Sequence, residues 1–150
     1  MSNGELFTII ATPDRSVAWD DFLVNTGRVI YLGGRQEVVI PRGDGGAETP
    51  VTFFPVDSLL SFAKAEQAFA DHRLKPADLY SIDAAIKTDP QRFDSLAVCS
   101  QWKDGGCWEM ATFRRGERKR ELYILRVECG CWCSFTYRTL WMAGIPIGAG

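Results

Sequence analysis

Short runs of apolar residues between turn-forming residues predict strands over much of the chain. The expected strands are residues 6–11, 28–32, 36–40, 51–56, 95–102 and 107–114, which are bounded by turn-forming residues. Gly33-Gly34 separates the second from the third, and glycine accepts positive φ without steric cost. We therefore expect residues 28–32 and 36–40 to form a tight hairpin.

Apolar residues recur at helical spacing in three other places. The expected helices lie near residues 16–25, 58–72 and 76–89. Ser16 is suited to cap the first helix, and Asp57 or Ser58 the second. Pro76 suits the first turn of the third helix, where its missing N–H costs little.

The densest group of β-branched and aromatic residues is 121–141, ELYILRVECGCWCSFTYRTLW. With Cys129-Gly130 as a two-residue turn, this stretch becomes a hairpin that pairs Leu122 with Tyr137. Both of its faces are then substantially apolar. Because an antiparallel sheet usually buries only one face, this hairpin needs two coverings: helices on one side, and more of this chain or a partner on the other.

These elements predict an α+β fold in a single domain, residues 1–150, because strands do not alternate regularly with helices. We expect a mostly antiparallel sheet, made of the N-terminal strands and a C-terminal four-strand meander, packed on two or three helices. Residues 143–150 contain three glycines and a proline, so we expect a flexible tail there.

Charge and hydropathy remove several classes of function. The 150 residues carry a formal net charge of -2, which gives no global reason to expect nucleic acid or an anionic membrane as partner. No apolar run approaches the roughly 20 residues that a membrane-spanning helix needs, and the N-terminus lacks the pattern of a secretory signal. We therefore expect a cytoplasmic protein.

The five cysteines are the sharpest candidates for chemistry, and in a chain without an export signal we expect them to be reduced. A zinc site is an alternative, and its ligands would come from Cys99, Cys107, Cys129, Cys131 and Cys133. Against it, alternate residues of a strand stand about 7 Å apart and do not converge on one ion. A thiol enzyme would have to use His72, the single histidine, as its base. We therefore expect no cofactor and no catalysis.

One part of the chain has an order of segments that resembles a known family. The segment WDDFLVNTGRVIYLGG is followed by the loop GDGG and then by VTFFPVDSLLSFAKAEQAF. This layout, from about Trp19 to Phe69, resembles the N-terminal half of the SseB-like domain, in which a short helix and a strand precede a strand-into-helix segment. Here that segment reads Phe54-Pro55-Val56-Asp57-Ser58, and the family's later Asn-Pro motif is missing. Since that family has no established chemistry, the resemblance implies an accessory or interaction role in bacteria.

A basic run at the expected turn before residue 121 and several aromatic residues on neighbouring strands have the composition of an interface centre. The candidate partner-binding residues are Arg114, Arg115, Arg118, Lys119, Arg120, Trp108, Trp132 and Tyr123. We predict a non-catalytic domain that binds another protein with an acidic surface, as a small bacterial or phage accessory, inhibitor or immunity-type factor. Solubility alone also explains a charged turn, and nucleic-acid binding through the same turn is a further alternative.

Overall fold

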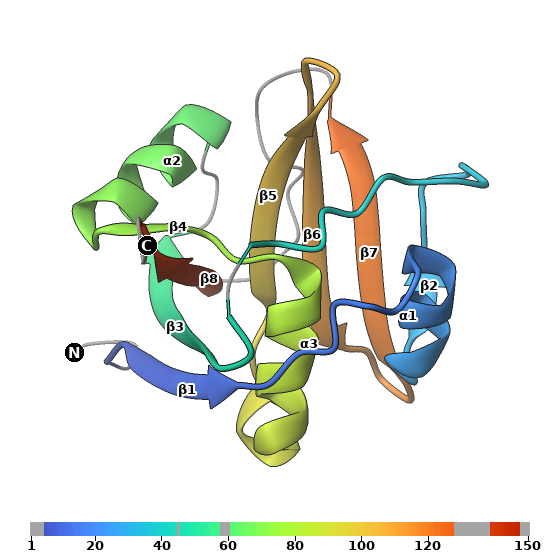
Figure 1. The fold of residues 1–150 in the computed structure, drawn as a ribbon, viewed down its shortest axis with the longest axis horizontal. Helices are drawn as coiled ribbons and strands as arrows, with labels where there is room; N and C mark the ends of the chain where they lie inside the picture. Colours follow the sequence, from blue (N-terminus) through green and yellow to red (C-terminus); the bar gives the residue numbers. More distant parts are fainter. Residues whose placement is uncertain (1–4, 45, 58–60, 128–138, 148–150) are drawn as a thin grey trace.

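A computed structural model describes residues 5–44, 46–57, 61–127 and 139–147, and it shows an α+β fold (Figure 1). In these residues the helices are α1 (Trp19–Asn25), α2 (Phe62–Asp71) and α3 (Leu79–Thr88), followed by the 3-10 turn η1 (Pro90–Phe93). The strands are β1 (Phe7–Ala11), β2 (Val29–Tyr31), β3 (Thr49–Asp57), β4 (Leu74–Pro76), β5 (Val98–Asp104), β6 (Cys107–Arg115), β7 (Arg120–Val127) and β8 (Thr139–Pro146). None of the helices in the described residues is long and apolar enough to cross a membrane.

The eight strands form one sheet in the order β1-β3-β8-β5-β6-β7-β2, with β4 also paired to β8. The meander of β5, β6 and β7 is antiparallel, as the sequence predicts. The pairs β2–β7 and β5–β8 are parallel, however. The sheet is therefore mixed, and the prediction of a mostly antiparallel sheet is wrong.

The strand that follows β7 in the chain, β8, does not lie beside it in the sheet. At Leu122 the edges of β7 pair with Phe113 of β6 and with Ile30 of β2, while Tyr137, its predicted partner, lies outside the described residues. Leu140 of β8 pairs with Val56 of β3, because β8 lies between β3 and β5. The Cys129-Gly130 turn and the other residues of 128–138 lie outside the described residues.

The Gly33-Gly34 pair forms a turn, with φ of +66° and +84°, but the predicted hairpin around it is wrong. Residues 36–40 form no strand, and β2 pairs with β7 instead. The segment crosses in front of β5, β6 and β7 (Figure 1). Val38 and Ile40 are buried there, so their apolar side chains cover the sheet rather than extend it.

Each face of the sheet has its own core. One contains Phe22 of α1, Ile82 of α3, Val38 and the inward side chains Leu122 and Ile124 of β7. The other is covered by α2 and reaches the opposite side of β7, where Val127 is buried. The two apolar faces of β7 therefore do need two coverings, and at these positions this chain supplies both.

The residues that cap α2 and α3 differ from those predicted. Ser61 and Asp78 cap α2 and α3 through the backbone N–H groups of Lys64 and Ser81, at 3.1 Å and 3.0 Å. Pro76 belongs to β4 rather than to a helix.

The start of α1 and the end of the chain differ as well. Ser16 does not cap α1, because its hydroxyl donates to Asp14 at 2.6 Å. Residues 143–146, expected in the tail, form the end of β8, where Ala143 and Ile145 are buried.

Candidate functional site

The predicted basic turn connects β6 to β7, at the lower right of Figure 1. Three of its five cations form ion pairs within the molecule. The guanidinium groups of Arg115 and Arg120 each contact the Asp94 carboxylate at 3.0 Å, and the Nε of Arg114 lies 3.1 Å from the Glu121 carboxylate. Arg115 and Arg120 therefore tie the turn to Asp94, which follows η1, and Arg114 ties β6 to Glu121 of β7.

Two further cations at this turn remain available. Arg118 and Lys119 are exposed, and no acidic group of the described residues lies within ion-pair distance of either. The turn is closed by a hydrogen bond from the Gly116 N–H to the Lys119 carbonyl oxygen, at 2.8 Å. The backbone thus fixes both cations on the outside of the turn.

An aromatic pair lies next to Arg114, on the strands that lead away from this turn. The rings of Tyr31 and Tyr123 stack at 4.5 Å, and the Arg114 guanidinium lies 5.6 Å from the centre of the Tyr123 ring. Both tyrosine hydroxyls donate to the Glu121 carboxylate, at 3.4 Å each. Burial raises the pKa of Tyr123, and the Glu121 carboxylate raises it further. Tyr31 is 41% exposed, so the outer face of the stack is accessible.

The predicted tryptophans do not join this group. Trp108 lies at the opposite end of β6, about 23 Å from Arg115 at the usual rise per strand residue. Its ring stacks on Phe62 of α2 at 4.8 Å, and Lys103 lies 5.0 Å above it. Trp108 therefore anchors α2, while Trp132 lies outside the described residues.

We define the tip surface as Tyr31, Arg114, Arg118, Lys119 and Tyr123. The sequence predicts four of these residues but misses Tyr31, because the parallel pairing of β2 with β7 has no local signal. An aromatic stack with an arginine and two exposed cations is the composition that protein interfaces favour.

The cysteines that the structure describes are not arranged for chemistry. Cys99 is fully buried, and its burial raises the pKa of the thiol to about 12. Cys107 is a half-exposed free thiol. Within the described residues, no three His, Cys, Asp or Glu side chains are grouped to hold a metal ion. Cys129, Cys131 and Cys133 lie outside those residues.

His72 is likewise used in the structure. Its Nδ1 lies 2.9 Å from the Ala68 carbonyl oxygen, and its ring stacks on Phe54 at 4.2 Å. The histidine therefore ends α2 and packs on the core.

The difference between the two described thiols is testable. Iodoacetamide at pH 8 should modify Cys107 and leave Cys99 unmodified, because only a thiolate reacts and the Cys99 thiol stays protonated and enclosed. Tryptic peptides separate the two, since Cys99 falls in residues 93–103 and Cys107 in residues 104–114. In denaturant both peptides should be modified equally. Rapid modification of Cys99 in the folded protein would contradict its burial.

A buried ionic cluster lies between β6, β7 and the turn after β2. The Glu109 carboxylate is 0% exposed and accepts two hydrogen bonds from Arg35, both at 2.9 Å, and one from Arg126 at 2.8 Å. Arg126 also contacts Asp104 at 2.9 Å. Each of these charges faces an opposite charge. The cluster therefore has a structural role: it holds the turn after β2 against β6 and β7.

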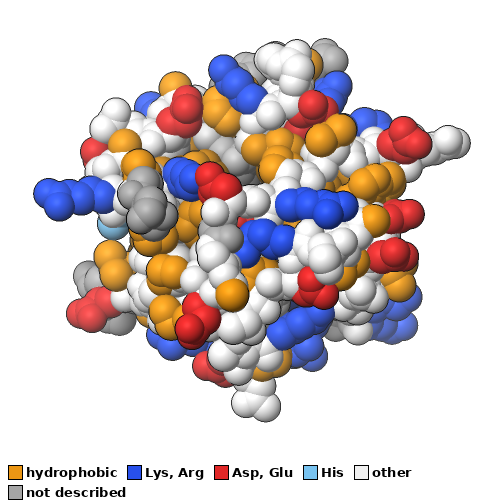
Figure 2. Space-filling model, in the orientation of Figure 1, with side chains coloured by type: hydrophobic (Ala, Val, Ile, Leu, Met, Phe, Trp, Pro, Cys, Tyr) orange, Lys and Arg blue, Asp and Glu red, His pale blue; other side chains and the backbone are white. Residues whose placement is uncertain are grey.

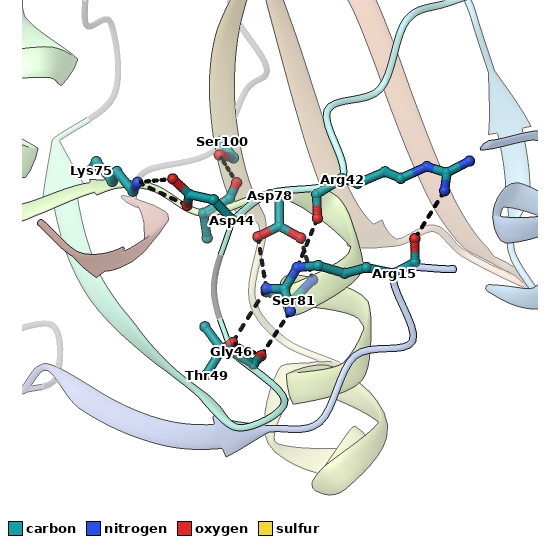
Figure 3. Close-up of polar contacts among 10 residues, drawn as sticks. Arg15, Arg42, Asp44, Gly46, Thr49, Lys75, Asp78, Ser81 and Ser100 are labelled. Carbon is teal, nitrogen blue, oxygen red and sulfur yellow. Dashed lines mark hydrogen bonds and ion pairs between the residues drawn. The ribbon is translucent and has the colours of Figure 1, made fainter. Parts of the chain in front are cut away.

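A second polar cluster surrounds Arg15 (Figure 3). Its guanidinium donates to the carbonyl oxygens of Arg42 and Gly46 at 2.8 Å and 3.0 Å, and to the Ser81 hydroxyl at 2.7 Å. It also lies 3.4 Å from the Asp78 carboxylate. Arg15 thus holds the glycine-rich loop before β3 against the first turn of α3.

The charges of the whole molecule are mixed on the face that Figure 2 shows. Lys and Arg side chains there alternate with Asp, Glu and hydrophobic ones. An extended surface of one sign, which nucleic-acid binding commonly uses, is therefore not a feature of this face.

Comparisons of the chain with family models, with curated proteins and with solved structures found no match. The resemblance to the SseB-like domain therefore stays a prediction from the sequence.

Proposed function

We propose that this protein is a non-catalytic domain that binds another protein through the tip surface, and that the partner presents acidic side chains there. The observation that carries the proposal is the position of Arg118 and Lys119, which are exposed on a closed turn and form no ion pair with the described residues. Acidic groups on a partner would supply the missing charge.

The aromatic stack next to Arg114 strengthens the proposal. Tyrosine and arginine are enriched at the energetic centres of interfaces because they bury a large area at low entropic cost. Here Tyr123 and Arg114 are already held by Glu121 and Tyr31, so docking would order few side chains. A preordered surface loses less entropy on binding than a flexible one.

Charge reversal tests the proposal. Arg118→Glu with Lys119→Glu should weaken partner binding at least tenfold, because two attractive contacts become repulsive. The melting temperature should hardly change, since both side chains are exposed and form no ion pair in the described part of the chain. The measurement is affinity capture from nuclease-treated extract of the producing cells, quantified by mass spectrometry, followed by titration calorimetry with each captured protein.

A matched control separates the tip from overall charge. Lys64→Glu, at an exposed position of α2, changes the net charge as Lys119→Glu does. We expect an acidic protein to be retained by the wild type and by Lys64→Glu but lost by the tip variants. Identical sets of captured proteins from all variants would contradict the proposal, and binding that disappears with nuclease treatment would favour nucleic acid instead.

A further inference from the structure

A pocket of about 360 Å³ lies beside the N-terminus of α3. None of the residues that line it belongs to the tip surface. Its lining comes from β4, the start of α3, β5, β8 and the loop before β3. The large apolar side chains around it are Pro41, Pro76, Leu79, Trp102 and Ile145. Leu79 and Ile145 are themselves buried, so the hollow reaches into the core.

The space exists because small residues line part of it. Gly43 and Ala77 both face the pocket, and Ala77 is buried. Protein interiors are normally packed to crystal-like density, so an apolar hollow of this size forgoes contacts that its walls would otherwise make. Its volume is at the lower end of the range for small-molecule sites, which begins at about 300 Å³.

The Trp102 side chain is fixed at the pocket. Its indole N–H donates to the Val39 carbonyl oxygen at 3.1 Å, which ties the ring to the segment that crosses the sheet. A held aromatic ring beside Leu79 and Ile145 offers a preformed apolar contact surface.

The polar end of the pocket carries one available cation. The Lys75 ammonium donates to both oxygens of Asp44, at 3.0 Å and 3.3 Å, as Figure 3 shows. The Asp44 side chain is 78% exposed, so it can turn into water with little loss. The hydrogen bond and charge of Lys75 lower the pKa of Asp44, as expected for an ammonium that stabilises a carboxylate.

The other carboxylate at the pocket, Asp78, already has partners within the fold. Asp78 accepts the Ser81 N–H at 3.0 Å and the Ser81 hydroxyl at 2.7 Å, and Arg15 lies 3.4 Å away (Figure 3). Its charge is therefore compensated within the fold. The available polar contact for a ligand is Lys75.

From these observations we infer that the pocket binds a small carboxylic acid with an aromatic or aliphatic body. The body packs against Trp102, Leu79 and Ile145, and the carboxylate takes the place of Asp44 on Lys75. Asp44 then acts as an internal competitor for the same ammonium group. This site is independent of the tip surface.

The inference is tested with 3-phenylpropionate and its neutral isostere 3-phenylpropanamide, by two-dimensional ¹H–¹⁵N NMR titration of the full chain. Saturable shifts are expected at the Trp102 indole N–H and at Ile145, with the acid binding about three- to tenfold tighter than the amide. Trp102→Phe assigns the indole signal.

Two variants with opposite expected effects make the test specific. Lys75→Met keeps the apolar stem and should remove the preference for the acid over the amide. Asp44→Asn should tighten acid binding by about two- to fivefold, because it releases Lys75 from its internal partner. Loss of folding cannot mimic a gain in affinity.

The inference is overturned if millimolar 3-phenylpropionate produces no saturable shift at Trp102 and Ile145, or if the acid and the amide bind equally well to the wild type. Weaker acid binding by Asp44→Asn would also overturn it, because Asp44 would then assist the ligand instead of competing with it.

Discussion

Glu109→Ala should lower the free energy of unfolding by about 3 kcal/mol, the scale found when one member of a buried ionic group is removed. Its carboxylate is fully buried and accepts three hydrogen bonds from Arg35 and Arg126. Without it, Arg35 loses its carboxylate partner and Arg126 keeps only Asp104. Because Arg35 and Arg126 remain 25% and 37% exposed, they can turn partly toward water, which limits the loss.

Urea denaturation monitored by tryptophan fluorescence measures this loss. Glu117→Ala is the matched control, since Glu117 is an exposed glutamate at the β6–β7 turn, and its effect should stay within about 0.5 kcal/mol. If the two variants lost equal stability, the ionic cluster would not lock the turn after β2 to the sheet.

Gly43→Ala should cost about 2–3 kcal/mol, from two separate causes. The φ of Gly43 is +79°, a conformation that costs an alanine about 1–2 kcal/mol. An added Cβ would also lie 2.5 Å from the Cγ of Asp78, so the carboxylate would have to move. That movement would weaken the cap of α3 and the contact with Arg15.

Gly34→Ala separates the two causes. Gly34 has a similar φ of +84°, but an added Cβ there would meet nothing within 4 Å. It should therefore show only the backbone cost, and thermal unfolding should rank Gly43→Ala as the less stable of the two. Equal losses would mean that Asp78 gives way freely and that Arg15 does not depend on its position.

The sequence predicts those parts of the fold that depend on neighbouring residues. Strand-forming residues and turn residues predict the β5–β6–β7 meander, and helical spacing predicts α2 and α3. In the structure these two helices begin after Ser61 and Asp78, whose side chains cap them.

Partner choice in the sheet could not be predicted in this way. Residues 29–31 and 140–145 are apolar enough to pair with several strands, and local turn signals favour the nearest one. The structure instead inserts β8 between β3 and β5 and places β2 beside β7. These non-local pairings depend on how both faces of the sheet become covered, which no short segment encodes.

The candidate sites likewise have a part that local sequence predicts and a part that depends on long-range contacts. The charge of the β6–β7 turn is evident from the sequence, but the internal ion pairs that leave only Arg118 and Lys119 available depend on Asp94 and Glu121. The long-range contacts of Arg15 and Arg35 join positions 27 to 89 residues apart, so spacing gives no sign of them.

A charge-swap cycle with the captured partner is the most direct measurement of the central claim, that the tip surface binds acidic groups of another protein. Lys119→Glu should weaken the complex, and replacing the facing partner carboxylate with lysine should weaken it as well. The two changes together should restore binding, because the pair is attractive again in reversed order. Losses that simply add would contradict the account, since they would show that the tip cation and the acidic group do not meet.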